Sequence, residues 1–258
     1  MSDPTSIKTP FKRTELLIRS HGYRLLAALL RRPYGEEGCR LQGDLQTHER
    51  RLESLDTPWK HRLARGIEKL SRLLPEIAQN EWVREYEYCF GHTAHSKVSA
   101  YELEYGGEHS RREPQELADI AAFYQAFGLQ VREGAHERGD HIHVESEFMH
   151  FLTFTAGYAL ERGENDHAAI CEESASRFLS DHLARWAPVF AVRLRRTAQS
   201  DWMKAIADFS LCFILTECEM QGIEAGDPDM PLRVIEEKVE TGCVSCALSP
   251  LSGDRGNH

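Results

Sequence analysis

The sequence has no long apolar run. No stretch approaches the roughly 18 consecutive apolar residues that span a bilayer, and the N-terminal MSDPTSIKTPFKRTE lacks the apolar core of a signal peptide. Basic residues are in the minority, 31 Lys and Arg against 41 Asp and Glu, for a formal net charge of −10. Nonspecific nucleic-acid binding usually needs a basic face. We therefore expect a cytoplasmic protein with no stable membrane insertion and no nucleic-acid partner.

Several enzyme signatures are also absent. There is no G-x-x-x-x-G-K-[ST] phosphate loop, no G-x-G-x-x-G fingerprint and no G-x-S-x-G nucleophile turn. The seven cysteines are odd in number and mostly scattered, which indicates reduced thiols rather than a disulfide framework. We expect neither catalysis nor a bound cofactor.

Helical spacing of apolar residues dominates the chain, without strand-like alternation or internal repeats. We expect an all-α fold: one globular domain of about seven to ten helices over residues 1–222, then a flexible tail over 223–258 rich in Gly, Pro, Asp and Ser. Pro188 is expected to bend the chain. Helices are predicted over 12–31, 58–73, 77–90, 114–128, 140–162, 164–186 and 200–221, with long loops at 91–113 and 129–139.

The segment 140–150, DHIHVESEFMH, concentrates three histidines and three carboxylates. Metal ligands on a helix must share a face, at i and i+3 or i+4. A metal-dependent helical enzyme is therefore the alternative reading, although the spacing H-E-x-x-H is absent. The simpler interpretation is a polar helix face with Asp140 as its N-cap. The candidate ligands are His141, His143, Glu145, Glu147 and His150.

Glu145 does not fit the interpretation of a polar helix face, because it falls on the predicted buried stripe with Met149 and Leu152. A buried carboxylate is costly unless it is paired or hydrogen-bonded. Glu145 is thus a candidate for binding a partner's cation or backbone donors.

Two other segments carry possible binding groups. The run 101–109, YELEYGGEH, combines tyrosines and glutamates in a way that suits an arginine-bearing peptide, although a flexible loop is the simpler interpretation. In the tail, Cys243 and Cys246 form a C-x-x-C pair. A tetrahedral metal site needs two more ligands, and no second C-x-x-C exists. We therefore predict no metal site, with these two thiols as the weak candidates.

The order of several motifs resembles the TorD/DmsD/NarJ-type chaperones, the redox-enzyme maturation proteins. The element DHIHVESEFM at 140–149 is similar to the family's D-H-I-x-x-E-L-E-F-M, with Ser146 in place of leucine. The resemblance covers about residues 12–220. Its other motifs are the opening helix before Pro33, EYEYCFG at 85–91, the loop around Tyr101, AAFYQAFGL at 121–129 and FLSDHLARW at 178–186. The E-Y-G-G-x-H loop and cysteine-bearing tail are more similar to chaperones of DMSO-reductase-like dehydrogenases and reductases.

This resemblance implies a TorD-like fold and a binding role. Such chaperones hold the catalytic subunit of a molybdenum oxidoreductase, often at its twin-arginine leader, until the molybdopterin cofactor is inserted before export. A homodimer is compatible with such a fold. A nucleotide-binding role ranks last, because no phosphate-cradling loop supports it. The candidate contacts for the leader peptide are Tyr101, Glu102, Tyr124, Asp140, His141 and Glu145.

Overall fold

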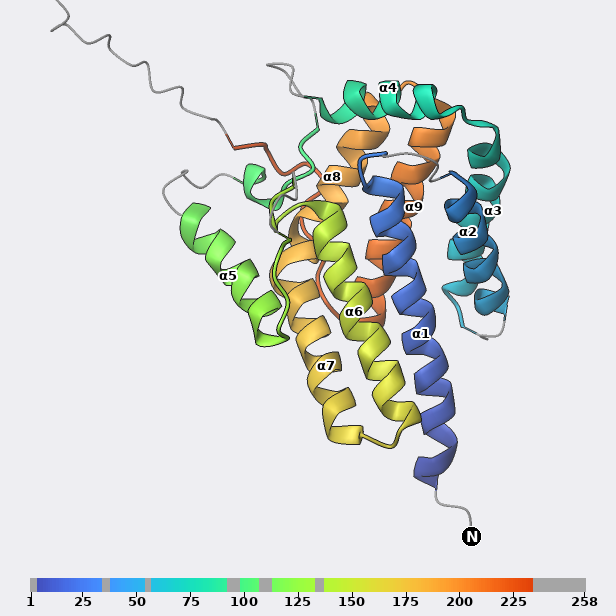
Figure 1. The fold of residues 1–258 in the computed structure, drawn as a ribbon, viewed down its shortest axis with the longest axis vertical. Coiled ribbons are helices and arrows are strands. Elements are labelled where there is room, and N and C mark those ends of the chain that lie inside the picture. Colours follow the sequence, from blue (N-terminus) through green and yellow to red (C-terminus); the bar gives the residue numbers. More distant parts are fainter. Residues whose placement is uncertain are drawn as a thin grey trace, which may run out of the picture.

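The protein is a helical bundle (Figure 1), described by a computed structural model over residues 4–33, 38–53, 57–91, 98–106, 113–132 and 137–233. Within these ranges lie nine α-helices and no strand, and two isolated β-bridges occur. The predicted all-α fold is confirmed. The helices are α1 (Pro4–Leu30), α2 (Gly38–Glu53), α3 (Lys60–Leu73), α4 (Gln79–Phe90), α5 (Glu113–Ala126), α6 (Ile142–Glu161), α7 (Asn165–Phe178), α8 (Ala184–Thr197) and α9 (Asp201–Gln221).

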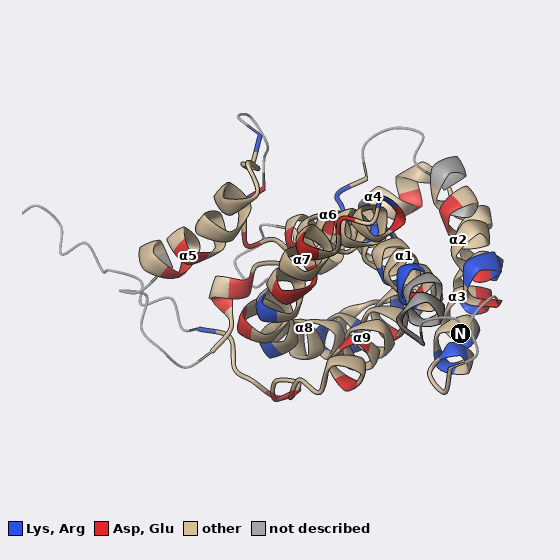
Figure 2. Cartoon of the chain, turned by 90° about the horizontal axis from the view of Figure 1, so that it is seen from below, with Lys and Arg blue, Asp and Glu red and all other residues tan. Residues whose placement is uncertain are grey.

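Two layers of helices enclose the core. Helices α1, α6 and α7 form one layer and α8 and α9 the other, with α2 and α3 along one side (Figures 1 and 2). α1 and α6 are antiparallel, because Arg13 pairs with Glu161 at one end and Ser20 contacts His150 further along. None of the described helices is both long and apolar enough to cross a membrane.

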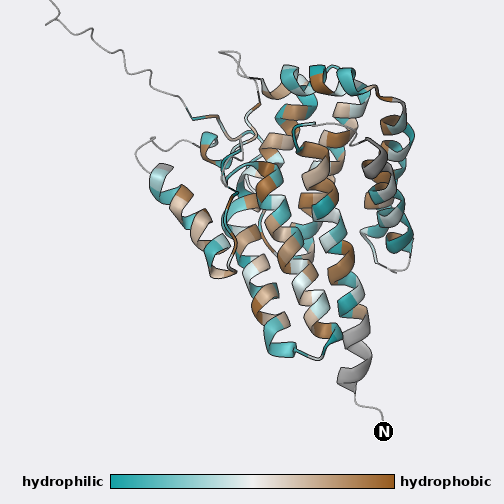
Figure 3. Cartoon of the chain, in the orientation of Figure 1, coloured by the Kyte–Doolittle hydropathy of each residue, from teal (hydrophilic) through white to brown (hydrophobic). Residues whose placement is uncertain are grey.

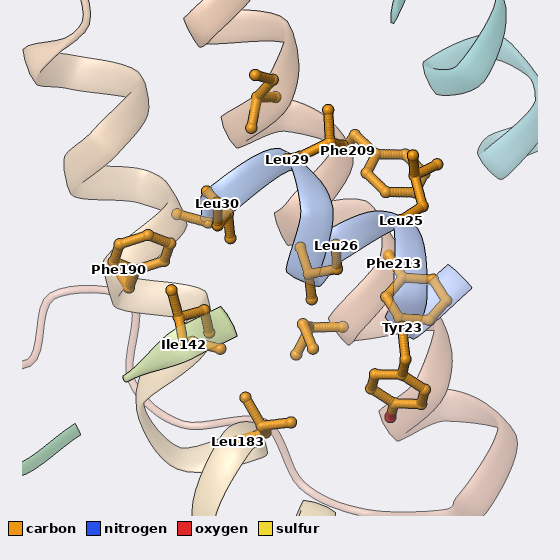
Figure 4. Packing of buried hydrophobic residues seen from close by; sticks show 14 of the residues in the cluster. Tyr23, Leu25, Leu26, Leu29, Leu30, Ile142, Leu183, Phe190, Phe209 and Phe213 are labelled. Carbon is orange, nitrogen blue, oxygen red and sulfur yellow. The ribbon is translucent and has the colours of Figure 1, made fainter. Parts of the chain in front are cut away.

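The core lies where the two layers meet. Leu26 and Leu30 of α1 and Ile142 of α6 lie near Leu183 and Phe190 of the opposite layer (Figure 4), and all are at most 1% exposed. Burying a side chain of this size stabilises the fold by about 1.5–3 kcal/mol. Apolar and polar stretches alternate along the helices of the bundle (Figure 3), as expected when one face of each helix is buried. The periodicity that predicted the helices is the periodicity of this packing.

Helix α2 is absent from the sequence-based prediction. Its buried side chains follow helical spacing, but they are Leu41, Leu45, His48 and Leu52. The histidine interrupts the apolar pattern, and the rest of the helix is mostly polar. Only packing against α1 and α3 reveals His48 as a core residue.

The predicted helix 164–186 divides into α7, a π-helical turn at Leu179–Leu183 and α8. Pro188, where a bend was expected, lies inside α8 and is buried. Proline has no N–H, and the Ala184 carbonyl four residues earlier loses its helical donor. The Gly226 N–H donates to that carbonyl at 2.7 Å instead.

Residues 223–233, here called the strap, return across the bundle past Gly222, the predicted domain end. Ile223, Ala225, Met230 and Leu232 pack against the core. The strap passes so close to α8 that a Cβ on Gly226 would lie 1.9 Å from the Arg185 carbonyl oxygen. Residues 223–233 therefore belong to the packed part of the chain, although the predicted tail included them. Cys243 and Cys246 lie outside the described residues.

Candidate functional site

A cleft of about 1080 Å³ lies between α5 and the opposite wall made by α7, the π-helical turn and α8. Figure 1 shows α5 standing apart from the bundle on this side. The 3-10 turn Glu102–Glu104 and the strap also line the cleft. Its charged and aromatic side chains are Glu102, Tyr105, Glu116, Asp119, Phe123, Phe127, Glu173, Arg177, Asp181, His182, Arg185, Trp186 and Arg233.

Aromatic contacts attach α5 to the bundle along one edge. The Phe123 ring meets Phe178 edge-on at 5.2 Å between centroids, and Tyr124 meets Phe148 at 4.8 Å. Phe127 adds a third contact to Phe148 at 5.9 Å. Aromatic pairs of this geometry contribute about 0.5–1.5 kcal/mol each beyond their buried area. These contacts leave the other edge of α5 free, and the cleft opens along it.

The two walls of the cleft carry acidic groups (Figure 2). Asp119 of α5 and Glu173 of α7 are exposed, and neither has an ion-pair partner among the described residues. Asp181 on the π-helical turn pairs with Arg177 at 3.4 Å. Unpaired carboxylates next to aromatic rings provide the chemistry for binding guanidinium groups, through hydrogen bonds and apolar contact.

Two glutamates meet beneath the cleft. Glu102 lines it, and one of its oxygens lies 3.1 Å from His182 Nδ1. Glu145 is fully buried behind, where one carboxyl oxygen accepts a 3.2 Å hydrogen bond from Trp186 Nε1 and the other has no partner in the described part of the chain. Burial, and then the charge of Glu102, raises the pKa of Glu145 well above 4.5. A carboxyl in this position therefore holds its proton to a higher pH than a solvent-exposed glutamate does.

Asp140 connects the start of α6 to the 98–106 segment. Its carboxylate accepts two hydrogen bonds from Arg138, at 2.9 and 2.7 Å, and one from the Leu103 N–H at 3.2 Å. Its carbonyl accepts from the Glu102 N–H at 2.9 Å. Asp140 thereby fixes the backbone that presents Glu102 to the cleft.

The predicted N-cap at Asp140 is therefore wrong, because that carboxylate is used elsewhere. His141 caps α6 instead, since its Nδ1 accepts from the His143 N–H at 3.2 Å. Burial and a nearby arginine lower the pKa of His141 to about 3, which keeps this nitrogen free to accept. Tyr101 packs edge-on against His141 at 5.0 Å and donates to Glu137 at 2.6 Å.

Tyr124 faces a second hollow rather than the cleft. This hollow, of about 320 Å³, is lined mainly by apolar side chains of α5 and the 129–139 segment, with Arg138 among its polar ones. The Tyr124 hydroxyl donates to the Gly139 carbonyl at 2.7 Å and so holds α5 to that segment. Of the six predicted contacts, Glu102 alone lines the cleft; Tyr101, Tyr124, Asp140, His141 and Glu145 do not.

The His/Glu set of the alternative reading does not come together. His141 and His143 touch, with Nδ1 atoms 2.8 Å apart, but Glu147 is exposed and His150 contacts Ser20 on α1. Among the residues that the structure describes, no group of three or more His, Cys, Asp or Glu could hold a metal ion.

Sequence reasoning missed most of the residues that line the cleft. The signal for one wall was present, because FLSDHLARW at 178–186 contributes Asp181, His182, Arg185 and Trp186. Asp119, Glu173 and Arg233 carried no local signal. They belong to separate elements, and only the tertiary fold brings them around one hollow.

Comparison with known proteins adds independent findings. The family model described as "Nitrate reductase delta subunit" matches residues 56–192. The selenate reductase assembly chaperone of Thauera selenatis is 35% identical over 81 residues, 31% of this chain and 41% of that protein. The chlorate reductase assembly chaperone of Ideonella dechloratans is 33% identical over the same shares. The chaperone protein TorD of Photobacterium profundum is 27% identical over 55% of this chain and 68% of its own length.

The matches to the selenate and chlorate reductase chaperones thus span about two-fifths of those proteins. The family match covers more than half of the chain, including α3, α4, α5, α6, α7 and most of α8. It contains the two main walls of the cleft. The chain therefore belongs to the nitrate reductase delta subunit family, which confirms the predicted relation to the TorD-type assembly chaperones.

Proposed function

We propose that this protein is an assembly chaperone, without catalytic activity, for the catalytic subunit of a molybdenum oxidoreductase. In this proposal it binds the client in the cytoplasm, at the twin-arginine leader, and holds it until the molybdopterin cofactor is inserted. The names of the relatives favour a client of the selenate or chlorate reductase kind. The observation that carries the proposal is the cleft beside α5, whose two walls hold the acids Asp119 and Glu173, without an ion-pair partner among the described residues.

The chemistry of the cleft suits a leader peptide. Such a peptide places two arginines beside an apolar run, so its receptor needs carboxylates next to apolar surface. Asp119 and Glu173 supply carboxylates from facing walls, and Phe123 and Phe127 supply aromatic surface between them. Glu102 adds a third acidic group at the base.

The other predicted residues act in this proposal by positioning. Asp140 holds the backbone of Glu102 and Leu103. Tyr124 holds α5 to the 129–139 segment, on the side away from the cleft. Their substitution is expected to weaken binding indirectly, by moving a wall of the cleft.

The test is calorimetric titration with a synthetic twin-arginine leader peptide. The wild type is compared with the double variant Asp119→Asn/Glu173→Gln. A matched control, Glu53→Gln/Glu68→Gln, removes two exposed acids from α2 and α3, on the other side of the bundle (Figure 1). Loss of one charge-assisted hydrogen bond weakens binding by about tenfold or more. We expect that loss in the cleft variant and none in the control.

A second peptide, with both arginines replaced by glutamine, tests the other partner of the contact. It should bind the wild type weakly, and the cleft variant should discriminate little between the two peptides. Equal weakening of peptide binding in the cleft and control variants would mean that the peptide responds to the net charge of the protein and not to the cleft. Strong binding that neither variant changes would exclude the cleft as the leader site.

A further inference from the structure

Arg233 of the strap is bound to the rest of the chain as an arginine of a peptide ligand would be. Its Nε donates to the Tyr105 carbonyl at 3.0 Å, and its Nη2 donates to the Glu116 carboxylate at 2.9 Å. The side chain is only 13% exposed, at the cleft. A guanidinium held between a carboxylate and a carbonyl oxygen is a compact recognition site.

The backbone around Arg233 is also held in the manner of an added peptide strand. The Arg233 N–H donates to the Glu104 carbonyl at 2.8 Å, and the Gly106 N–H donates to the Pro231 carbonyl at 2.9 Å. Tyr105 and Leu232 form the antiparallel bridge between the two segments. Backbone pairing with a pocket for one side chain is a common mode of peptide recognition.

We propose that the Tyr105 carbonyl and the Glu116 carboxylate form a guanidinium subsite of the cleft, which Arg233 fills until an arginine of the client displaces it. This inference rests on the proposed function. Glu116 and Asp119 lie three residues apart on α5, both line the cleft, and so share a face. One carboxylate is occupied by Arg233, and the other has no ion-pair partner among the described residues.

The occupation by Arg233 is incomplete. Its Nη1 is buried and has no hydrogen-bond partner in the described part of the chain. An unsatisfied buried donor weakens the hold of this side chain on its site. A client peptide that places one arginine at Glu116 and a second at Asp119, which has no ion-pair partner among the described residues, gains contacts that Arg233 lacks.

The experiment measures the affinity of the full-length chain for a twin-arginine leader peptide in Arg233→Gln and in Arg196→Gln. Arg196 is the matched control, because it also pairs with a strap residue, Asp229, but outside the cleft and with both side chains largely exposed. Removal of the internal competitor should tighten peptide binding by about tenfold relative to the control. Thermal unfolding of each variant, followed by circular dichroism, checks that the fold is retained.

A second pair of variants ties the gain to the subsite. In the Glu116→Gln background, Arg233→Gln should give no further tightening, because the shared carboxylate is gone. Equal affinity of Arg233→Gln and Arg196→Gln, with binding intact, overturns the competition and leaves the proposed function standing. Weaker binding by Arg233→Gln also overturns it, since Arg233 would then be part of the receptor. Absence of peptide binding in every variant overturns both proposals.

Discussion

Glu145 and Trp186 are joined by a buried hydrogen bond of 3.2 Å, from the indole Nε1 to one carboxyl oxygen. The other oxygen is buried and has no partner among the described residues. The contact ties α6 to α8 directly behind Glu102 and His182 of the cleft. Burial raises the pKa of this carboxyl, and the shift has a measurable consequence for stability.

Replacement of Glu145 by glutamine should stabilise the protein at neutral pH. The folded-state pKa lies above the ordinary 4.5, so above pH 4.5 the folded chain binds more protons than the unfolded chain. Stability therefore falls as the pH rises from 4.5 toward the folded-state pKa. Glu145→Gln removes this loss, and we expect a gain of about 1 kcal/mol or more at pH 7.

Urea unfolding of Glu145→Gln between pH 4.5 and 7 measures this effect. The advantage of the variant should grow with pH, whereas Glu68→Gln, an exposed substitution on α3, should show no such trend. A variant less stable than the wild type by a constant amount at every pH would mean that the carboxyl is needed for its contacts and not its charge state.

His48 should be a source of acid sensitivity. It is fully buried in α2, neither ring nitrogen has a partner in the described part of the chain, and burial lowers its pKa to about 3. Between pH 6.5 and 3 the unfolded chain binds one more proton at this site, so stability falls as the pH drops below 6.5. His48→Leu should raise stability by about 1–3 kcal/mol at pH 7.

The advantage of His48→Leu should widen by about 2 kcal/mol at pH 5, where the unfolded imidazole is charged. Chemical unfolding at both pH values is the measurement. His61→Leu, at an exposed position of α3, is the control and should leave the pH dependence unchanged. A less stable His48→Leu at pH 7 would show that the imidazole has hydrogen-bond partners after all.

The buried ion pair between α1 and α9 should fail if one partner is removed. Arg19 donates three hydrogen bonds to Glu217, at 2.9–3.1 Å, and Tyr23 donates a fourth at 2.9 Å. Burial would lower the pKa of Arg19, but Glu217 raises it more. Arg19→Met leaves a buried, uncompensated carboxylate and should cost about 3–5 kcal/mol.

The double variant Arg19→Met/Glu217→Leu should recover part of that loss, because no unpaired charge remains. Free energies of unfolding for the two single variants and the double variant give the coupling. If the losses of the single variants simply add in the double variant, the pair is not coupled and the explanation fails.

The strap should be sensitive to one methyl group. Gly226→Ala places a Cβ against the Arg185 carbonyl and should separate the strap from α8, with loss of the Gly226 hydrogen bond to Ala184. We expect a cost of at least about 1–3 kcal/mol and faster exchange of the Gly226 and Arg233 amide hydrogens. Both are measurable by chemical unfolding and hydrogen exchange.

Gly43→Ala is the control for this change. Gly43 lies in α2 with nothing within 4 Å of the added carbon, so alanine should stabilise the helix by about 0.5–1 kcal/mol. If the strap amides of Gly226→Ala exchange their hydrogens as slowly as those of the wild type, the strap shifts without detaching.

The sequence by itself determined the helical architecture. Helical periodicity is a local property, because the spacing of apolar residues within one segment predicts a helix and its buried face. The spacing in α1, α6 and α9 was therefore enough to predict the all-α fold. It also carried the family relation, through the segment at Asp140 and the segment at Phe178. The helix that it missed, α2, has His48 at a core position, where the local pattern breaks.

Only the tertiary structure decided which groups meet. The sequence marked Asp140 as a helix cap, but α6 begins one residue later with His141 as its N-cap, and the Asp140 carboxylate instead accepts from Arg138 and Leu103. The cleft brings Asp119, Glu173 and Arg233 together from three elements. Contacts between residues far apart in the chain depend on how whole helices pack, and no local spacing encodes them.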